Sequence, residues 1–304
     1  MGPGDARALG RGLAPLMPMP EAVSIIIPVY NEEGAIASTL GTVDETMRST
    51  GREYEVLVVD DGSADGTATA LAAAGARVVR HRANRGYGAA LKTGIRATSH
   101  PLIAILDADG TYPIARLPDL LQRAEEADMV VGARTGGSVH VPALRRPVKW
   151  LLTRVANVLS GHRIPDLNSG MRVFRRDLAE RFFGLYPQGF SFTSTITLAS
   201  HINGYRVEYV PIDYYRRTGA SSIRPVRDTL NFFLLIVRMV VTFRPLNVFL
   251  PTAAALLVLG AIKAGLDFSR TGAFGVGAAI LILTAIQVAL MGLLADLVTR
   301  RTSL

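Results

Sequence analysis

Two carboxylates separated by one residue follow an apolar run in the middle of the chain. Residues 102–106 (LIAIL) lack polar alternation, which predicts a strand buried on both faces. Asp107-Ala108-Asp109 comes next, at the carboxyl end of this predicted strand. Open α/β sheets bind ligands at the carboxyl ends of their strands. Mg²⁺ and Mn²⁺ prefer oxygen ligands and commonly share them with substrate phosphates. The pattern therefore favours a metal site, although an acidic turn facing solvent would also fit Asp-x-Asp alone.

The residues around this acidic pair alternate between strand signals and helix signals. Apolar runs at 23–29 and 55–60 predict two further buried strands, each followed by polar residues. Such alternation predicts an α/β fold with a largely parallel sheet, whose carboxyl edge collects the polar residues. The pattern is completed by helix signals at 36–49, 67–74, 89–97 and 117–126, and by strand signals at 77–80, 129–132, 168–174 and 205–215.

The composition excludes several kinds of chemistry. The chain has 304 residues and no cysteine, which excludes disulfides, thiolate catalysis and cysteine-ligated zinc. Its five histidines show no metal-binding spacing. A formal net charge of +8 suits nucleic acid, an anionic membrane surface or phosphorylated substrates. No nucleic-acid recognition motif is present. The apolar residues are concentrated in the last third of the chain, so we favour the membrane.

Two long apolar segments near the C-terminus predict a helical hairpin that spans a membrane. Segments 246–268 and 274–298 each exceed the roughly 20 residues needed to cross a bilayer. Arginines flank the outer ends of the hairpin, whereas its short link holds only Arg270. Because cytoplasmic flanks are enriched in Lys and Arg, both termini and the preceding domain are expected in the cytoplasm. The flanking arginines are Arg244, Arg300 and Arg301.

These signals divide the chain into four parts. Residues 1–20 are rich in Gly, Pro and Ala and predict a disordered tail. A domain at 21–225 follows, and it includes a basic amphipathic helix at 145–160. Residues 226–245 are very apolar but contain arginine, which predicts a helix lying in the membrane interface. The transmembrane hairpin occupies 246–304.

Four motifs in order carry a resemblance to a known family. They are Ile27-Pro28-Val29-Tyr30-Asn31-Glu32-Glu33, Val59-Asp60-Asp61-Gly62-Ser63, Asn84-Arg85-Gly86-Tyr87-Gly88 and Asp107-Ala108-Asp109. Together they resemble the family-2 glycosyltransferases of the GT-A fold, roughly from residue 23 to 215. The whole layout resembles the polyprenyl-phosphate group, the dolichyl-phosphate mannose and glucose synthases. Those enzymes carry a cytoplasmic GT-A domain, interfacial helices and, in many members, a C-terminal transmembrane hairpin.

The resemblance implies a reaction and a donor site. The reaction would be inverting transfer of a hexose from a GDP-mannose or UDP-glucose type donor to a polyprenyl phosphate at the cytoplasmic membrane face. Pro28, Tyr30 and Glu32 would line the base and ribose pocket. Asp60 would accept hydrogen bonds from the base, while Asp61 would hold the Asn84 loop or cap a helix. The implied donor-binding residues are Pro28, Tyr30, Glu32, Asp60, Asp61, Asn84, Gly88, Lys92, Asp107, Ala108 and Asp109.

The resemblance assigns the chemistry to Asp107, Asp109, Asp166 and Arg217. Asp109 would ligate the Mg²⁺ or Mn²⁺ that bridges the diphosphate, and Asp107 would contact the metal or the ribose. Such a metal neutralises charge that develops on the leaving nucleoside diphosphate. Asp166 would position the sugar or the acceptor, with a role as catalytic base left open, because an acceptor phosphate is already ionised at neutral pH. A simple turn residue after Pro165 is the alternative for Asp166.

A group of basic and small residues would bind the acceptor phosphate. Guanidinium groups suit this task because they form paired, charge-assisted hydrogen bonds to phosphate. A loop of small residues beside them could close over the acceptor. Alternatively, these arginines face anionic lipid headgroups. The candidates are Arg134, Arg172, Arg216, Arg217, Ser221, Ser222 and Arg224.

Other functions fit parts of the sequence. Donors with a UDP-linked uronic acid or amino sugar are equally compatible with the motifs. Processive polysaccharide synthases share the early motifs, but Trp150 is the only tryptophan and does not stand in the Gln-x-x-Arg-Trp motif that they usually carry. A non-catalytic membrane scaffold is disfavoured by the intact acidic pair. A homo-oligomer assembled through the hairpin is also compatible with the sequence.

Overall fold

The computed structural model describes residues 21–136, 154, 157, 161–189, 191–215 and 245–302. Its strands are β1 (Val23–Val29), β2 (Tyr54–Asp60), β3 (Val78–Arg80), β4 (Leu102–Ile105), β5 (Met129–Ala133), β6 (Arg172–Arg175) and β7 (Val207–Pro211). They form one sheet in the order β3-β2-β1-β4-β6-β5-β7. Strand β6 runs antiparallel to both neighbours, and the other pairs are parallel. The predicted α/β fold with a largely parallel sheet is confirmed.

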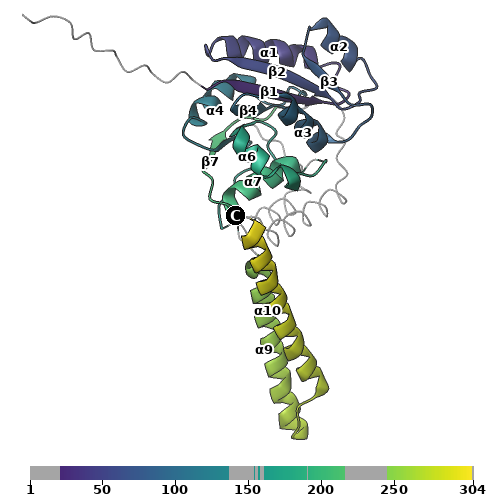
Figure 1. The fold of residues 1–304 in the computed structure, drawn as a ribbon, viewed down its shortest axis with the longest axis vertical. Helices are drawn as coiled ribbons and strands as arrows, with labels where there is room; N and C mark the ends of the chain where they lie inside the picture. The colour runs from purple at the N-terminus through teal and green to yellow at the C-terminus, as the bar shows by residue number, and fades with distance from the viewer. Residues whose placement is uncertain are drawn as a thin grey trace, which may run out of the picture.

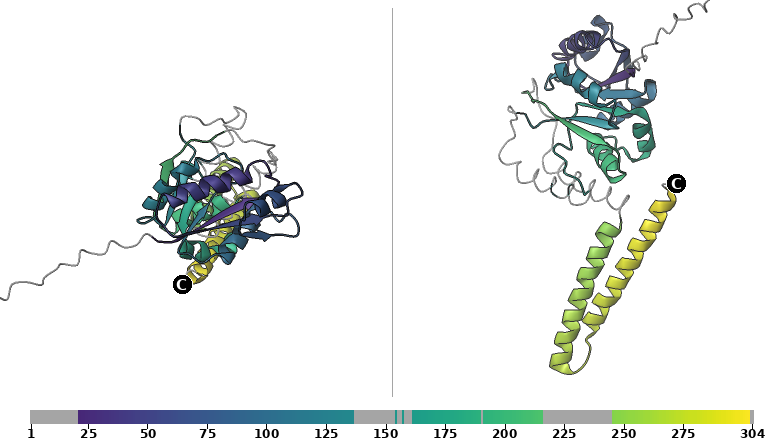
Figure 2. Two further views of the ribbon diagram at one scale, coloured as in Figure 1. Left: turned by 90° about the horizontal axis from the view of Figure 1, so that it is seen from above. Right: turned by 90° about the vertical axis from the view of Figure 1, so that its left-hand side faces the viewer.

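Helices cover both faces of this sheet (Figure 1). They are α1 (Ile36–Arg48), α2 (Thr67–Ala73), α3 (Tyr87–Ala97), α4 (Leu117–Arg123), α6 (Arg176–Arg181) and α7 (Phe192–Ile202), with 3₁₀ turns η1 (Ile114–Arg116) and η3 (Phe183–Leu185). Apolar side chains of α1, α2 and α4 fill the core on one face. Those of α3, α6 and α7 fill the core on the other face. The sheet is therefore the middle layer of a three-layer domain (Figure 2).

The central strand β1 shows why the chain forms this sandwich. All seven of its residues are buried. Ile25 and Ile27 point into one core, whereas Ile26 between them points into the other. A strand covered on both faces needs apolar residues at every position. This requirement explains the continuous apolar run that the sequence shows.

The register of the sheet brings the polar strand ends together. Val29 at the end of β1 is paired with Asp60 at the end of β2. On the other side of β1, Ile26 is paired with Ile105 of β4. Because these strands are parallel, the loop after each one leaves the sheet at the same edge. The residues that follow Val29, Asp60 and Ile105 are therefore neighbours in space.

Two helices were not predicted from the sequence. They are α6 and α7, which lie between the strands β6 and β7. All eleven residues of α7 are buried, so this helix lacks the alternation of apolar and polar faces that marks a surface helix. Its sequence FTSTITLASHI is also rich in β-branched residues, which have low intrinsic helix propensity.

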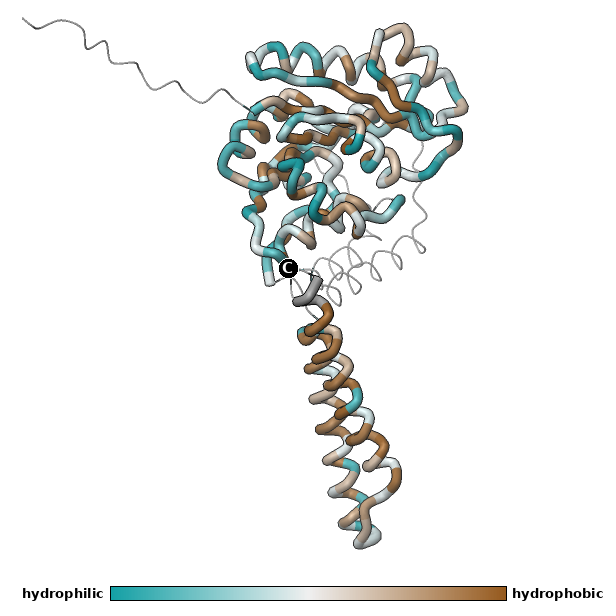
Figure 3. Tube along the Cα trace, in the orientation of Figure 1, coloured by the Kyte–Doolittle hydropathy of each residue, from teal (hydrophilic) through white to brown (hydrophobic). Residues whose placement is uncertain are grey.

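The C-terminal hairpin projects from the sheet domain, and its turn lies at the far end (Figures 1 and 2). It consists of α9 (Leu246–Thr271) and α10 (Val276–Thr302), which pack along their length. Both helices are long and apolar enough to cross a membrane, hydrophobic residues predominate along them (Figure 3), and many of their large apolar side chains are exposed. Helix α9 extends to Thr271, beyond the predicted end at 268, and Gly272 then ends it with a φ of 71°.

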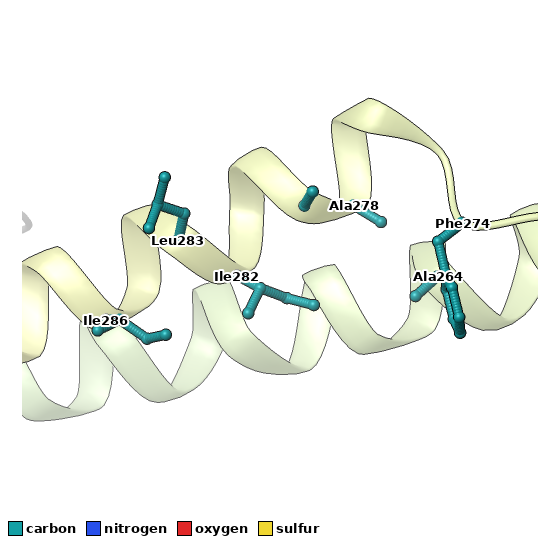
Figure 4. A pocket seen from close by; sticks show the side chains of 7 residues that line it. Ala264, Phe274, Ala278, Ile282, Leu283 and Ile286 are labelled. Atoms are coloured by element: carbon teal, nitrogen blue, oxygen red, sulfur yellow. The ribbon is translucent and has the colours of Figure 1, made fainter.

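An apolar groove of about 340 Å³ lies between these helices, near the turn (Figure 4). Side chains without polar atoms line it, so the groove suits hydrocarbon and not a polar substrate. Its lining residues are Ala264, Phe274, Ala278, Ala279, Ile282, Leu283 and Ile286. The predicted tail at 1–20, and almost all of the predicted helices at 145–160 and 226–245, lie outside the described residues.

Candidate active site

A cavity of about 330 Å³ opens at the carboxyl ends of β1, β2 and β4. Its walls come from the loops after these strands, from the start of α3, and from the segments around β6 and α7. Most of the predicted donor-binding residues are brought together here. The lining residues are Pro28, Val29, Tyr30, Glu32, Asp61, Asn84, Gly86, Tyr87, Ala90, Asp107, Ala108, Asp109, Asn168, Gly170 and Thr193.

The charged side chains among the described residues that line this cavity are all acidic. Glu32, Asp61, Asp107 and Asp109 line it, and no Lys, Arg or His side chain is among its described lining residues. An anionic ligand would be repelled unless a cation accompanied it. Carboxylate oxygens are the ligands that a hard divalent cation prefers. Within the described residues, no group of three or more His, Asp and Glu could hold a metal. The rest of its coordination shell would have to come from a bound substrate, water or other parts of the chain.

The acidic pair after β4 is held in place by hydroxyl donors. Tyr87 donates its hydroxyl hydrogen to Asp107 Oδ1 over 2.9 Å, and burial raises the pKa of Tyr87 well above its usual value. Thr111 donates to Asp109 Oδ1 from its hydroxyl over 2.6 Å and from its backbone N–H over 3.2 Å. Gly170 lies directly against the Asp107 carboxylate, where a Cβ would overlap it. Both carboxylates are therefore oriented toward the cavity and could hold a metal together with a diphosphate.

The loop after β1 is tied to the loop after β2. Asn31 adopts a φ of 54°, and its side-chain oxygen accepts the N–H of Ala64 over 2.9 Å. Asn is one of the few residues that tolerates this left-handed conformation. The N–H of Glu32 donates to the Thr67 hydroxyl over 2.9 Å. These bonds hold Tyr30, which is 44% exposed, at the mouth of the cavity.

The structure separates the two acidic residues at the end of β2. Asp60 is buried beneath the loop, where Oδ1 accepts the N–H of Ser63 and Oδ2 lies 3.0 Å from Arg80 Nε. It is not among the residues that line the cavity. Asp61 does line it. The structure therefore places Asp61, and not Asp60, at the wall of the cavity.

Asp61 is also the anchor of the loop that precedes α3. Its Oδ1 accepts the N–H of Arg85 over 3.0 Å, and its Oδ2 accepts the N–H of Gly86 over 2.7 Å. His81 Nδ1 lies 2.6 Å from Oδ1, and His81 Nε2 lies 2.9 Å from the Thr93 hydroxyl. Asp61 thus holds the Asn84 loop, as the sequence suggested, and it is the member of this acidic pair that lines the cavity.

Two further predicted donor residues, besides Asp60, do not line the cavity. Gly88 packs against the backbone of 187–189, and its N–H donates to the Gly189 carbonyl over 3.2 Å. The close approach that this glycine allows is therefore to the protein's own chain and not to a nucleotide. Lys92 Nζ donates to the Tyr186 carbonyl over 3.1 Å, beside the Phe183 ring. Neither residue contributes to the cavity lining.

Asp166 forms a buried, two-pronged ion pair with Arg134. Arg134 Nε donates to Asp166 Oδ2 over 2.7 Å, and Arg134 Nη2 donates to Asp166 Oδ1 over 2.9 Å. The backbone N–H groups of Arg134 and Asn168 complete the set of donors. Burial by itself would raise the pKa of Asp166, but the hydrogen bonds and charge of Arg134 outweigh it and lower that pKa to about 2. Such a carboxylate is a weak base, and the arrangement favours a positioning role.

Arg172, predicted to bind phosphate, is completely buried. Its guanidinium donates to the carbonyls of Ser169 and Thr193 and to the Thr197 hydroxyl. It therefore joins the loop before β6 to the first turn of α7. This placement favours a structural role beneath the cavity over direct contact with an acceptor phosphate.

The rest of the predicted acceptor site follows directly after Tyr215 in the sequence. Arg216, Arg217, Ser221, Ser222 and Arg224 lie outside the described residues. The chain that leads to them is fixed, because the N–H of Tyr215 donates to the Thr111 carbonyl over 2.9 Å. The Tyr214 ring packs edge-on against Tyr112 and lies under the Arg134 guanidinium.

Sequence reasoning assigned no site role to several cavity residues. Tyr87 stands within one of the four motifs, and Asn168 and Gly170 lie between the predicted site residues Asp166 and Arg172, so their positions could have been inferred from these neighbours. Thr193 begins a helix that was not predicted, and no sequence signal pointed to it. The other lining residues without an assigned role are Val29 and Ala90.

The Asp166–Arg134 pair predicts a pH-dependent contribution to stability. Because the pKa of Asp166 is lowered on folding from 3.8 to about 2, its contribution is complete above about pH 5 and is lost as the pH falls toward 2. The lost contribution should be about 2 kcal/mol. The measurement is urea unfolding of the wild type and Asp166→Asn in detergent, as a function of pH.

The difference in unfolding free energy between these two proteins should shrink from pH 5 to pH 2. A difference that stays constant over this range would contradict the assignment. Asp119→Asn is the matched control, because Asp119 forms an exposed ion pair with Arg116. Such pairs contribute less than about 1 kcal/mol.

Comparison with known proteins agrees with this architecture. Residues 24–183 match the family described as Glycosyl transferase family 2, and residues 244–300 match the GtrB C-terminal hairpin. A dolichyl-phosphate hexose transferase of Haloferax volcanii is 33% identical over 205 residues, which cover 67% of this chain and 87% of the relative. An undecaprenyl-phosphate 4-deoxy-4-formamido-L-arabinose transferase of Klebsiella pneumoniae is 26% identical over 298 residues, which cover 93% of this chain and 90% of the relative.

The fold is also that of a solved glycosyltransferase structure. Glucosyl-3-phosphoglycerate synthase of Mycobacterium tuberculosis, crystallised with Mn²⁺, UDP-glucose and phosphoglyceric acid, superposes with a TM-score of 0.56. The identity is 19%, and the match covers 72% of this chain and 80% of that one. At this identity the likeness concerns the GT-A fold alone. The match to the transferase family, its hairpin and its polyprenyl-phosphate relatives together establish that this chain belongs to glycosyltransferase family 2, in the group of polyprenyl-phosphate sugar transferases.

Proposed function

We propose that this protein is a metal-dependent hexosyltransferase of the cytoplasmic membrane face. It would transfer a hexose, with inversion, from a GDP-mannose or UDP-glucose type donor to a polyprenyl phosphate. The products would be polyprenyl-phosphate hexose and a nucleoside diphosphate. The transferase domain would occupy residues 21–225, followed by an interfacial helix at 226–245 and the membrane hairpin at 246–304.

The observation that carries this proposal is the acidic lining of the cavity. A nucleoside diphosphate is anionic, yet Glu32, Asp61, Asp107 and Asp109 line the cavity, and no cationic side chain is among its described lining residues. Binding of such a donor therefore calls for a cation between the two sets of negative charge. Asp107 and Asp109 offer hard oxygen ligands, and Mg²⁺ and Mn²⁺ both fit them. When bound, the metal would neutralise charge on the leaving diphosphate.

The residues of this chain would hold the reactants and need not move a proton. An oxygen of the acceptor phosphate attacks the anomeric carbon, and the bond from that carbon to the diphosphate oxygen breaks with its electron pair. The acceptor oxygen is already ionised at neutral pH, so a general base is not required. Asp166 agrees with this scheme, because its four hydrogen-bond donors and its pKa of about 2 make it a poor base.

The position of the hairpin supports a lipid acceptor. Both of its ends lie beside the sheet domain (Figure 1), so the hairpin would hold this domain at the membrane surface. The hairpin is flanked by Arg244, Arg300 and Arg301, and its link holds only Arg270, which supports a cytoplasmic domain. Arg217 and its neighbours would then meet the lipid phosphate at headgroup level.

The alternative functions differ in which sugar is transferred or in whether the protein is an enzyme at all. A relative that transfers a formamido-arabinose keeps other donor sugars open, including UDP-linked amino sugars and uronic acids. A non-catalytic scaffold would have no need for Asp107 and Asp109 to be oriented by Tyr87 and Thr111. We favour the hexose donor and the active enzyme.

The decisive experiment uses the full chain in lipid nanodiscs with a polyprenyl phosphate. UDP-glucose and GDP-mannose are supplied in turn with Mg²⁺ or Mn²⁺, and nucleoside diphosphate and lipid-linked sugar are quantified together. We expect equal amounts of the two products from at least one donor. Bound nucleotide without lipid-linked sugar from any donor would favour the scaffold.

We predict that Asp109→Ala lowers turnover by about three orders of magnitude. The change removes one of two carboxylates that would hold the metal, and such a metal supplies several kcal/mol of transition-state stabilisation. Initial rates at saturating donor measure the effect, with Asp119→Ala on the protein surface as control. Full activity of Asp109→Ala in excess chelator would rule out the metal site.

We predict that Arg217→Ala weakens the use of the lipid and spares the nucleotide. One charge-assisted hydrogen bond contributes roughly 1.5–3 kcal/mol, so its loss should lower kcat/KM for polyprenyl phosphate about tenfold to a hundredfold. Binding of UDP or GDP should change less than about twofold. Unchanged kinetics for the lipid would indicate that Arg217 only faces lipid headgroups.

We predict the orientation from single cysteines, since the natural chain has none. Ser269→Cys lies near the hairpin turn and Ser99→Cys lies on the surface of the sheet domain. A membrane-impermeant maleimide should label Ser269→Cys in intact cells and Ser99→Cys only after lysis. The reverse labelling pattern would place the domain outside the cytoplasm.

A further inference from the structure

A buried histidine lies directly behind one wall of the cavity. His81 follows β3, its backbone N–H donates to the Asp60 carbonyl over 2.8 Å, and it is only 8% exposed. It does not line the cavity, but its hydrogen-bond partner Asp61 does. An imidazole in this position can therefore affect a bound ligand only through Asp61.

Both ring nitrogens of His81 contact neighbouring elements. Nδ1 lies 2.6 Å from Asp61 Oδ1 in the loop after β2, and Nε2 lies 2.9 Å from the Thr93 hydroxyl on α3. An ionised carboxylate can only accept hydrogen bonds, so Nδ1 carries a hydrogen and donates it to Asp61. The Thr93 hydroxyl can donate to Nε2 of a neutral ring or accept from a protonated ring. His81 thus joins α3 to the loop that carries Asp61.

His81 provides the side-chain donor to the Asp61 carboxylate. The other described donors are the backbone N–H groups of Arg85 and Gly86, which belong to the loop that Asp61 itself holds. Asp61 is 3% exposed, and a buried carboxylate needs donors on its oxygens. Without the His81 donor, Oδ1 would keep only the Arg85 N–H, and the carboxylate would be free to turn.

The backbone around this carboxylate is closely packed. Gly62 adopts a φ of 76°, and a Cβ there would lie 2.7 Å from the Ala83 carbonyl carbon. Gly86 has a φ of 99° and lines the cavity beside Asp61. Glycine is the residue that adopts such conformations readily. With the backbone held on both sides, the orientation of the Asp61 side chain is the feature that depends on His81.

We propose that His81 is a positioning residue for donor binding, which holds the Asp61 carboxylate toward the nucleoside part of the nucleotide sugar. Thr93 in turn holds the imidazole ring in place. This role rests on the proposed function, in which Asp61 binds the donor. His81 lies outside the four sequence motifs.

The test compares two substitutions of nearly equal shape. His81→Asn keeps a donor, because Nδ2 of asparagine and Nδ1 of histidine are both bonded to Cγ, whereas His81→Leu replaces that donor with a methyl group. Both variants leave a similar void where the rest of the ring was. Calorimetric titration of UDP and GDP with Mn²⁺ into the full chain in nanodiscs measures the affinity. For the nucleotide that the wild type binds, we expect at least a tenfold loss in His81→Leu and less than a threefold loss in His81→Asn.

His100 supplies the matched control. Its Nε2 lies 3.9 Å from Glu55 Oε1, and it does not line the cavity. His100→Asn and His100→Leu should therefore both keep the wild-type affinity for nucleotide.

Thr93→Val gives a second measurement that retains the imidazole ring, and it keeps the proposal testable if His81→Leu does not fold. We expect a threefold to tenfold loss of nucleotide affinity in the wild-type background and no further loss in His81→Leu. Such non-additivity is expected of groups that act in one chain of contacts. Unchanged affinity in Thr93→Val, or the same loss in both backgrounds, would overturn the role of this chain.

Steady-state kinetics distinguish positioning from general support of the fold. At saturating polyprenyl phosphate, His81→Leu should raise KM for the donor while kcat changes less than threefold. Equal affinity losses in His81→Asn and His81→Leu, or a lower kcat with unchanged nucleotide affinity, would overturn the proposal. Absence of transfer from every donor would refute the proposed function, whereas the nucleotide titrations would still report the role of His81.

Discussion

Repulsion between carboxylates is the constraint on which the candidate site depends. Glu32, Asp61, Asp107 and Asp109 line one cavity, and no cation is among the described side chains that line it. Hydrogen bonds orient three of them: the Tyr87 hydroxyl donates to Asp107, the Thr111 hydroxyl donates to Asp109, and backbone N–H groups donate to Asp61. Under the proposed function, a cation bound beside these carboxylates would let an anionic donor enter, and donor binding would then be linked to metal binding.

The fold supplies the geometry that this electrostatic arrangement needs. Parallel pairing of β1 with β2 and β4 brings three polar loops to one edge, and hydrogen bonds between the loops hold them there. The buried Arg172 beneath this edge joins the Asn168 loop to α7. The strands thus fix the acidic edge of the cavity, while the segments around β6 and α7 provide its other wall. The hairpin would anchor this domain to the membrane that holds the proposed lipid acceptor.

Much of the fold followed from the sequence, because buried strands require continuous apolar runs and loops at their ends require polar residues. The sequence did not predict the order of the strands, the helix α7 or the exact partners of each side chain. Asp60 and Asp61 are adjacent and chemically identical, and only the direction of the chain after β2 decides which one reaches the cavity. Gly88 and Arg172 matched the motifs, yet packing against 187–189 and burial under the cavity assign them structural roles. Helix α7 was missed because a helix buried on all sides shows no amphipathic period.

The central claim is that a divalent cation is required before an anionic donor can enter this acidic cavity. Calorimetric titration of UDP and GDP into the full chain in nanodiscs, with Mn²⁺, with Mg²⁺ and with excess chelator, tests it directly. The account predicts that at least one nucleotide binds with metal and that its affinity falls at least a hundredfold in chelator. Equal affinity with and without metal would contradict it, because the four carboxylates would then have to tolerate a diphosphate with no cation between them.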